Sequence, residues 1–210
     1  MSRRGILVVV SGFAGSGKGT LMKELTGRYD HYALSVSATT RAPRPGEVEG
    51  REYFFKTTDE FEKMISEDAF VEYARYVNNY YGTPRDYVEK QLAAGRDVIL
   101  EIEIQGALQV KEKFPETLLL FVMPPSAGIL RERLVGRGTE TMPVIEARLS
   151  RAAEEAEGIE QYDYLIINDI LEECVTAMHQ IIQNEHARTF RNKEFINNMR
   201  EELKSFSKGE

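Results

Sequence analysis

Residues 12–20 combine residue types that bind polyphosphates. The segment reads GFAGSGKGT, with glycine at four of its nine positions and a single lysine, Lys18. Glycine accepts backbone conformations that turn successive N–H groups toward one point, and the lysine adds a positive charge beside them. A helix that follows would present the positive end of its dipole to the same point. This chemistry predicts that the segment binds the phosphates of a nucleoside triphosphate.

The elements on either side of this segment must hold it in place. Ile6 to Val10 form an apolar run that is typical of a strand buried on both faces, and a strand, a glycine-rich loop and a helix together define a P-loop. Gly19 stands where a serine or threonine usually follows the lysine, so Thr20 or a water must take that place beside Mg²⁺. We predict that ATP is bound by Gly12, Phe13, Ala14, Gly15, Ser16, Gly17, Lys18, Gly19 and Thr20.

The rest of the chain alternates between apolar runs and amphipathic stretches. Runs at residues 98–104, 118–123 and 164–167 predict an α/β fold of the P-loop NTPase type, with a parallel five-stranded sheet flanked by helices. A proline- and glycine-rich stretch with a helix candidate near Thr58 interrupts this alternation, and a later stretch rich in arginine and glutamate is typical of a mobile cover. We predict one domain over residues 1–210, divided into a core (1–34, 96–134 and 159–210), an inserted α+β subdomain (35–95) and a lid (135–158).

Residues 35–53 could hold a second phosphate. The stretch SVSATTRAPRPGEVEGREY brings hydroxyls, arginines and a tyrosine together without an apolar period. Arginine offers planar pairs of donors to phosphate oxygens, and tyrosine adds a neutral donor. Taken alone, the stretch is equally typical of an exposed basic loop, so its function depends on the motifs around it.

This stretch is the first of five motifs that together resemble one family. The others are FVEYARYVNNYYGTP, LEIEIQG, LRERLVGRGTE and YDYLIIND, in that order along the chain. From about Ile6 to Glu185 the chain resembles guanylate kinases. The resemblance implies a cytoplasmic enzyme of purine nucleotide metabolism that transfers the γ-phosphoryl group of ATP to GMP, and to dGMP, with Mg²⁺ as cofactor. It also implies that the inserted subdomain binds GMP.

The resemblance assigns residues to the acceptor site. It places a phosphate group among Arg41, Arg44, Tyr53 and Tyr81, and a base among Ser37, Glu72 and Thr83. Guanine presents two adjacent N–H donors beside its O6 acceptor, so a carboxylate such as Glu72 can accept two bonds while a hydroxyl such as Thr83 donates to O6. Adenine presents a different pattern and would not fit.

Glu101 and Glu103 fall in the presumed strand of residues 98–104, where every second residue is apolar. Both carboxylates would then share one face of the strand. At the carboxyl end of a parallel strand they could hold hydrated Mg²⁺ or read the guanine edge, and the alternative is two acids on an exposed face. We favour Glu101, with Thr20, for the metal and Glu103 for the base, although the division stays open.

The resemblance also matches Arg133, Arg137 and Arg148 to the family's cover segment, where each could neutralise charge on the transferred phosphoryl group. We predict that Arg137 and Arg148 are catalytic together with Lys18, and that Arg133 lies on a helix surface. The acceptor is itself a phosphate oxygen, so positioning and charge neutralisation suffice without a nucleophilic side chain. The three histidines, His31, His179 and His186, are therefore interpreted as structural or surface residues.

Composition excludes some other functions. A net charge of -7 opposes nonspecific binding to nucleic acid. No run of 18 apolar residues exists and the first residues lead directly into a strand, so we expect neither a membrane span nor a leader. Cys174, the only cysteine, is expected to be a buried thiol, and residues 188–208 are expected to form a solvated helix.

Two rival functions are also compatible with the sequence. A kinase on the same scaffold could act on another monophosphate or on a phosphorylated sugar. A guanylate-kinase-like interaction module could instead bind protein partners without turnover, although the intact loop around Lys18 and the lid arginines count against it.

Overall fold

The computed structural model describes residues 3–76, 78–138 and 141–207. Its main layer is a five-stranded sheet in the order β2-β7-β1-β8-β9, in which every neighbouring pair is parallel. The strands are β1 (Leu7–Gly12), β2 (Tyr32–Leu34), β7 (Asp97–Glu101), β8 (Leu118–Met123) and β9 (Tyr164–Ile167). The predicted α/β fold with a parallel five-stranded sheet is confirmed.

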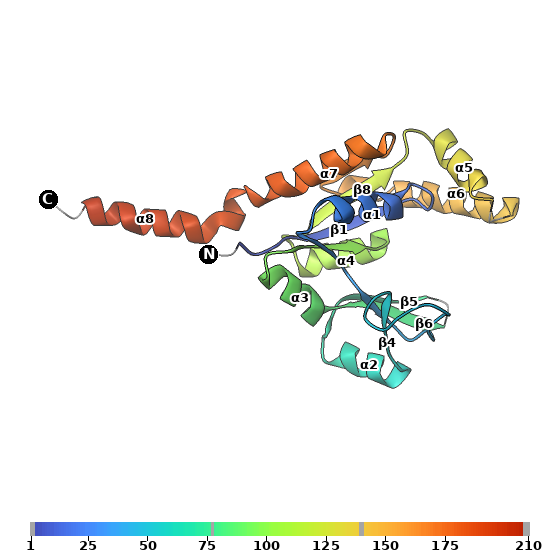
Figure 1. Ribbon diagram of the computed structural model, residues 1–210, viewed down its shortest axis with the longest axis horizontal. Coiled ribbons are helices and arrows are strands. Elements are labelled where there is room, and N and C mark those ends of the chain that lie inside the picture. Colours follow the sequence, from blue (N-terminus) through green and yellow to red (C-terminus); the bar gives the residue numbers. More distant parts are fainter. Residues whose placement is uncertain (1–2, 77, 139–140, 208–210) are drawn as a thin grey trace.

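Helices cover both faces of this sheet, which explains why its strands read as continuous apolar runs (Figure 1). From the central strand, Val8 and Val10 pack against α1 (Lys18–Arg28) and α7 (Leu171–His186). Val9, between them, points to the other face and packs among residues of α3 (Arg85–Ala93) and α4 (Ile104–Lys113). Each such fully buried side chain stabilises the fold by about 1.5–3 kcal/mol.

The inserted region forms a second sheet in the order β4-β3-β6-β5. Its strands are β3 (Ser37–Thr39), β4 (Tyr53–Phe55), β5 (Phe70–Tyr76) and β6 (Asn79–Pro84). Helix α2 (Thr58–Ser66) starts at a capping box formed by Thr57 and Glu60, as the helix prediction near Thr58 requires, and buries Phe61 in a separate small core. Because α3 packs on the main sheet, the part of the insertion with its own core ends near Pro84.

A helix hairpin, whose second helix falls within the predicted lid (135–158), lies at the end of the molecule opposite α8 (Figure 1). Helices α5 (Ala127–Gly136) and α6 (Met142–Ala156) share a core with Phe13 and Phe121, whose ring centroids are 5.1 Å apart. A short 3-10 helix, η1 (Ile159–Gln161), follows. Residues 139–140, which belong to the predicted lid and to the motif LRERLVGRGTE, lie outside the described residues.

One predicted strand is shorter than expected. The run at residues 98–104 ends as a strand at Glu101, and Glu103 is the N-cap of α4. The Ile102 carbonyl accepts a hydrogen bond from the Ser11 hydroxyl at 2.7 Å, so the chain has left the sheet ladder before the helix starts. The prediction that Glu101 and Glu103 share one face of a strand was therefore wrong.

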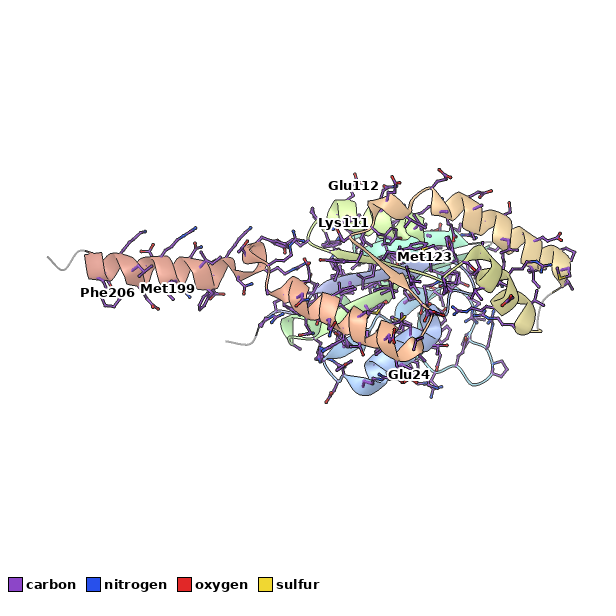
Figure 2. All side chains as sticks on the ribbon, turned by 90° about the horizontal axis from the view of Figure 1, so that it is seen from above. Glu24, Lys111, Glu112, Met123, Met199 and Phe206 are labelled. Atoms are coloured by element: carbon purple, nitrogen blue, oxygen red, sulfur yellow. The ribbon has the colours of Figure 1, made fainter. Side chains whose placement is uncertain are left out.

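The carboxyl-terminal helix differs from its prediction in another way. After α7 and the 3-10 helix η2 (Thr189–Asn192), helix α8 (Lys193–Ser207) extends away from the body of the molecule (Figure 1). It is solvated as predicted, but it also exposes large apolar side chains, two of which are labelled in Figure 2. These side chains are Phe195, Met199, Leu203 and Phe206. None of the helices in the described part of the chain has the length and apolar character needed to cross a membrane.

Candidate active site

The P-loop lies between β1 and α1, at the carboxyl end of the sheet, where its glycines allow close packing. Gly17 has φ 92° in the left-handed region, and a Cβ there would lie 2.4 Å from the Asn168 amide nitrogen. At Gly12 a Cβ would lie 2.0 Å from the Val122 carbonyl oxygen. Neither position can hold a larger residue unless the loop moves.

The start of α1 is left open to a ligand. Its N-cap, Gly17, offers no side chain, and the first turn contains no acid. The Ser16 hydroxyl is buried and has no hydrogen-bond partner among the described residues. The free N–H groups at the start of a helix and the positive end of its dipole together favour an anion. This end of α1 therefore fits a phosphate group.

Two residues from other elements hold the loop. The Asn168 amide donates to the Ser16 carbonyl at 2.8 Å, and Arg133 donates to the same carbonyl at 3.3 Å. Arg133 also donates to the Asn168 carbonyl at 2.8 Å. The hypothesis that Arg133 is a helix-surface residue was therefore wrong, because its guanidinium braces the P-loop. Sequence reasoning missed the role of Asn168, although it lies in the motif YDYLIIND.

Lys18 lies back on its own loop. Its ammonium group donates to the Gly12 carbonyl at 2.5 Å and to the Phe13 carbonyl at 3.3 Å. Two neutral carbonyls satisfy part of its hydrogen-bonding capacity but leave its charge uncompensated at short range. The same charge can therefore turn to an anionic ligand at the helix start.

Charged groups from several elements surround Lys18. Burial lowers the pKa of the Lys18 ammonium, and the negative charges of Glu101, Glu155 and Glu103 oppose that shift. The positive charge of Arg137 lowers the pKa of Lys18 further, so this predicted catalytic arginine acts on the same locus. Glu155 was not singled out from the sequence. The charges of Glu101, Glu103, Glu155 and Arg137 thus all act on the lysine of the P-loop.

Glu103 has a partner on α6. Arg151 of α6 forms an ion pair with Glu103, and its Nε donates to Glu155 Oε1 at 3.0 Å. The Glu103 side chain is 71% exposed, so the pair is solvated and weak. In this structure Glu103 therefore faces α6, and its predicted contact with a base stays a prediction. Arg148 is half-buried on the same helix.

The predicted base site contains a buried carboxylate. Glu72 on β5 and Thr83 on β6 lie opposite each other, and the Thr83 hydroxyl donates to Glu72 Oε1 at 2.7 Å. Burial raises the pKa of Glu72, and the bonds from Thr83 oppose the rise. A Cβ at Gly106 of α4 would lie 3.6 Å from Oε2, so the missing side chain leaves room beside the second carboxylate oxygen. Ser37, also predicted here, is half-buried on β3.

The four residues predicted to bind the acceptor phosphate lie together on the inserted sheet and its loop. The Arg41 guanidinium is 5.4 Å from the centroid of the Tyr53 ring, and the Tyr53 and Tyr81 rings are 6.1 Å apart. Arg41 forms an ion pair with Glu47, and the backbone N–H of Arg44 donates to the same carboxylate at 2.7 Å. Glu47 was not predicted as part of the site.

The residues proposed for Mg²⁺ are exposed at the loop. Thr20 lies in the first turn of α1 and Glu101 at the carboxyl end of β7. Within residues 3–76, 78–138 and 141–207, no group of three or more His, Cys, Asp or Glu side chains is arranged to hold a metal ion. Mg²⁺ usually keeps several waters and binds one or two carboxylates plus substrate phosphates, so a sparse donor set beside an anion site fits it.

The cysteine and two of the histidines are packed against other side chains. Cys174 is buried, and His179 stacks on Tyr29 with ring centroids 3.8 Å apart. His186 is buried between Asp97 and Arg3, away from the P-loop. These groups contribute to packing.

Comparisons with known proteins give matches to one family. The family model "Guanylate kinase" matches residues 4–185. A guanylate kinase from Bacillus cereus is 51% identical, covering 96% of this chain and 99% of the relative, and one from Caldanaerobacter subterraneus is 48% identical, covering 96% and 98%. The crystal structure of guanylate kinase from Anaplasma phagocytophilum matches with a TM-score of 0.69 and 34% identity over 90% of both chains.

Proposed function

We propose that this chain, which belongs to the guanylate kinase family, is an enzyme that transfers the γ-phosphoryl group of ATP to GMP and releases ADP and GDP. One observation supports the transfer most directly: α4 connects the donor and acceptor sites. Its N-cap, Glu103, acts electrostatically on Lys18, while Gly106 adjoins the Glu72 carboxylate. These two positions are about 4.5 Å apart along the helix axis, so nucleotides held at the two sites would be neighbours.

The P-loop and Lys18 bind the phosphates of ATP in this proposal. Arg41, Arg44, Tyr53 and Tyr81 hold the phosphate of GMP, which is largely dianionic at neutral pH because its second pKa is about 6. One of its oxygens forms a bond to the γ-phosphorus of ATP while the bond to the bridging oxygen of ADP breaks. No proton has to be removed from the acceptor, so no general base is required.

Glu72 selects guanine by accepting from its two adjacent N–H groups. In the structure the hydroxyl proton of Thr83 is already donated to Glu72, so we assign Thr83 the role of orienting that carboxylate. Its predicted donation to O6 would require the hydroxyl to rotate, whereas Ser37 remains available for that contact. Glu103 could add a further acceptor if Arg151 released it.

Arg137 and Arg148 neutralise charge on the transferred group when the lid closes. Arg137 already lies within electrostatic reach of Lys18, and α6 bears Arg148. Closure also excludes water, which limits hydrolysis of ATP. Thr20 and Glu101 would hold Mg²⁺, with water between, and the ion would supply positive charge beside the phosphates of ATP.

Both substrates belong to purine nucleotide metabolism, and we place the reaction in the cytoplasm. A coupled assay of ADP formation with ATP and a panel of GMP, dGMP, AMP, CMP and UMP tests the proposal. We expect turnover with GMP and dGMP alone. Turnover with another monophosphate would favour the rival kinase, and an absence of turnover with intact GMP binding would favour the interaction module.

A further inference from the structure

Glu47 binds the guanidinium of Arg41 with both carboxylate oxygens. Arg41 Nη2 donates to Glu47 Oε1 at 2.8 Å and to Oε2 at 2.9 Å. The two side chains are 16% and 17% exposed, so this is a sheltered pair within an otherwise open loop. The other terminal nitrogen, Nη1, donates to the Ala42 carbonyl at 2.7 Å. Both ends of the Arg41 fork are therefore held by its own loop.

The same carboxylate closes the loop at Arg44. The backbone N–H of Arg44 donates to Glu47 Oε2 at 2.7 Å, and the backbone N–H of Glu47 donates back to the Arg44 carbonyl at 3.0 Å. One side chain thus fixes the guanidinium of Arg41 and the backbone of Arg44. These are the two arginines of the proposed acceptor-phosphate site, and hydrogen bonds from both lower the pKa of Glu47, which keeps it ionised.

Donors of Arg41 remain for a ligand in this arrangement. A guanidinium has five N–H groups, and the bonds to Glu47 and Ala42 come from Nη2 and Nη1. The Tyr81 side chain is a further hydrogen-bond partner, and these contacts do not use all five groups. The guanidinium also lies 5.4 Å from the ring centroid of Tyr53, another proposed phosphate ligand. An arginine side chain has about 2 kcal/mol of rotamer entropy to lose when it is fixed, and Glu47 removes that freedom before a ligand arrives.

We propose that Glu47 is a positioning residue, which holds Arg41 and the Arg44 loop in the arrangement that receives the phosphate of GMP. This inference rests on the proposed function. A negative charge near a phosphate site also repels the ligand, so the two effects oppose each other. For Glu47 to leave, the bonds to Arg41 and to the Arg44 N–H would have to break together, so the carboxylate stays behind the guanidinium and positioning prevails.

Glu47→Gln is the test, because it removes the charge while keeping the shape. Glu52→Gln is the matched control: Glu52 also accepts from a loop N–H, that of Val48, and pairs with an arginine, Arg51. Both variants and wild type are compared for GMP binding by calorimetry, for KM of GMP and of ATP, for kcat, and for inhibition by guanosine, which lacks the phosphate.

Loss of one charge-assisted contact should weaken GMP binding and raise its KM by about tenfold in Glu47→Gln. Guanosine inhibition, the KM for ATP and kcat should change little, and Glu52→Gln should resemble wild type. Tighter GMP binding in Glu47→Gln would show competition with phosphate and overturn the proposal. Unchanged binding, or an equal loss in Glu52→Gln or for guanosine, would overturn it as well.

Two further outcomes are distinguishable. If Glu47→Gln does not fold, Glu47→Asp, which keeps the charge, is measured in the same way. We expect it to lose less GMP affinity than Glu47→Gln would, and an unchanged affinity would contradict the proposal. If wild type binds GMP but forms no GDP, the proposed function fails while the calorimetric comparison still decides the role of Glu47.

Discussion

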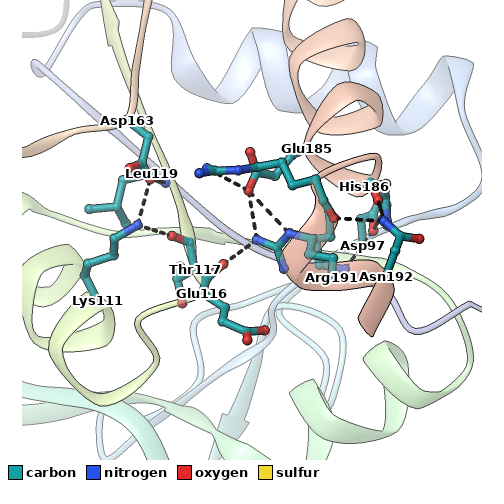
Figure 3. Close-up of polar contacts among 12 residues, drawn as sticks. Asp97, Lys111, Glu116, Thr117, Leu119, Asp163, Glu185, His186, Arg191 and Asn192 are labelled. Atoms are coloured by element: carbon teal, nitrogen blue, oxygen red, sulfur yellow. Dashed lines mark hydrogen bonds and ion pairs between the residues drawn. The ribbon is translucent and has the colours of Figure 1, made fainter. Parts of the chain in front are cut away.

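The two ends of the main sheet use charge in opposite ways. At the carboxyl end, Lys18, Glu101 and Arg137 come near one another in a partly exposed loop region, where a ligand can complete their interactions. At the amino end, buried charges are paired with one another, as Figure 3 shows for the contacts around Glu185 and His186. The difference indicates that the charges around Lys18 can still gain interactions from a ligand, whereas the buried charges at the amino end already satisfy one another.

Asp97 is the centre of the amino end. It is 1% exposed, and its carboxylate accepts from the Ile6 N–H and from His186 Nε2, each at 2.8 Å. Arg3 donates to His186 Nδ1 at 2.6 Å, and because arginine can only donate, the proton of His186 must reside on Nε2. This chain of contacts ties the amino terminus, β7 and α7 together.

The amino end also contains two cavities, and charged side chains line both of them. Cavities of about 110 and 490 Å³ lie near the start of β1, at the amino end, and both are lined by Arg4 and Arg191. These arginines form ion pairs with Glu89 and Glu185. The charges of Arg4 and Arg191 are thus already compensated by these acids.

Lys18→Ala should have the largest effect on activity. Removing the only lysine of the P-loop should lower kcat by at least about 10³-fold, because its charge acts on the outer phosphates of ATP. The melting temperature should not fall, since the lysine bonds only two carbonyls of its own loop. Lys23→Ala, an exposed change on the same helix, is the control. Near-normal turnover in Lys18→Ala would refute the ATP site.

Arg137→Ala and Arg148→Ala should have the next largest effect on activity. Each should lower kcat by about 10³-fold while the KM for GMP changes little, because the contacts tighten in the transition state. Steady-state kinetics with both substrates varied separates the two constants, and Arg131→Ala on α5 serves as the control. A loss confined to KM would place these arginines in ground-state binding instead.

Asp97→Asn should lower stability without lowering kcat, the reverse of the P-loop and arginine variants. The new amide would face a buried donor on His186, which should lower the free energy of unfolding by about 1 to 3 kcal/mol and leave kcat unchanged. Urea unfolding measures the loss. Asp163→Asn is the matched control, because Asp163 also accepts from a backbone N–H and a cation but its side chain is 32% exposed. A drop in kcat without a loss of stability would contradict the comparison.

The features predictable from sequence are the local ones. The P-loop, the buried strands and the start of α2 each depend on neighbours in the chain, and each was located to within a few residues. The site residues Glu72 and Thr83 could be named only by resemblance, yet the structure places them in direct contact.

The missed features depend on distant contacts. Arg133 and Asn168, which together hold the P-loop, are 35 residues apart, so no local sequence pattern predicts their contact. The end of β7 is decided by a hydrogen bond from Ser11, 91 residues away from Ile102 in sequence. The exposed apolar side chains of α8 were not predicted, because its many charged residues are typical of a solvated helix and α8 lies beyond the matched residues 4–185.

The proposed reading of guanine by Glu72 is tested most directly by the ratio of kcat/KM for GMP to that for AMP, measured in wild type and Glu72→Gln. In the variant the glutamine NH₂ group would face a guanine N–H, so that two donors meet and one hydrogen bond is lost. The ratio should therefore fall by roughly ten- to a hundred-fold, as expected for about 1 to 3 kcal/mol of base discrimination. Thr83 can still donate to the amide oxygen, so the pair should persist.

The melting temperature of Glu72→Gln and the pH dependence of the GMP to AMP ratio add two controls to this measurement. The pKa of Glu72 is raised in the folded state, so its ionised form opposes folding at neutral pH, and this penalty fades as the pH falls through that pKa. Glu72→Gln removes the penalty and should not lower the melting temperature. GMP selectivity of wild type should also decline toward low pH as Glu72 is protonated, whereas the variant should show no such decline. If the GMP to AMP ratio is instead the same in both proteins, Glu72 does not read the base, and the assignment of the acceptor site is contradicted.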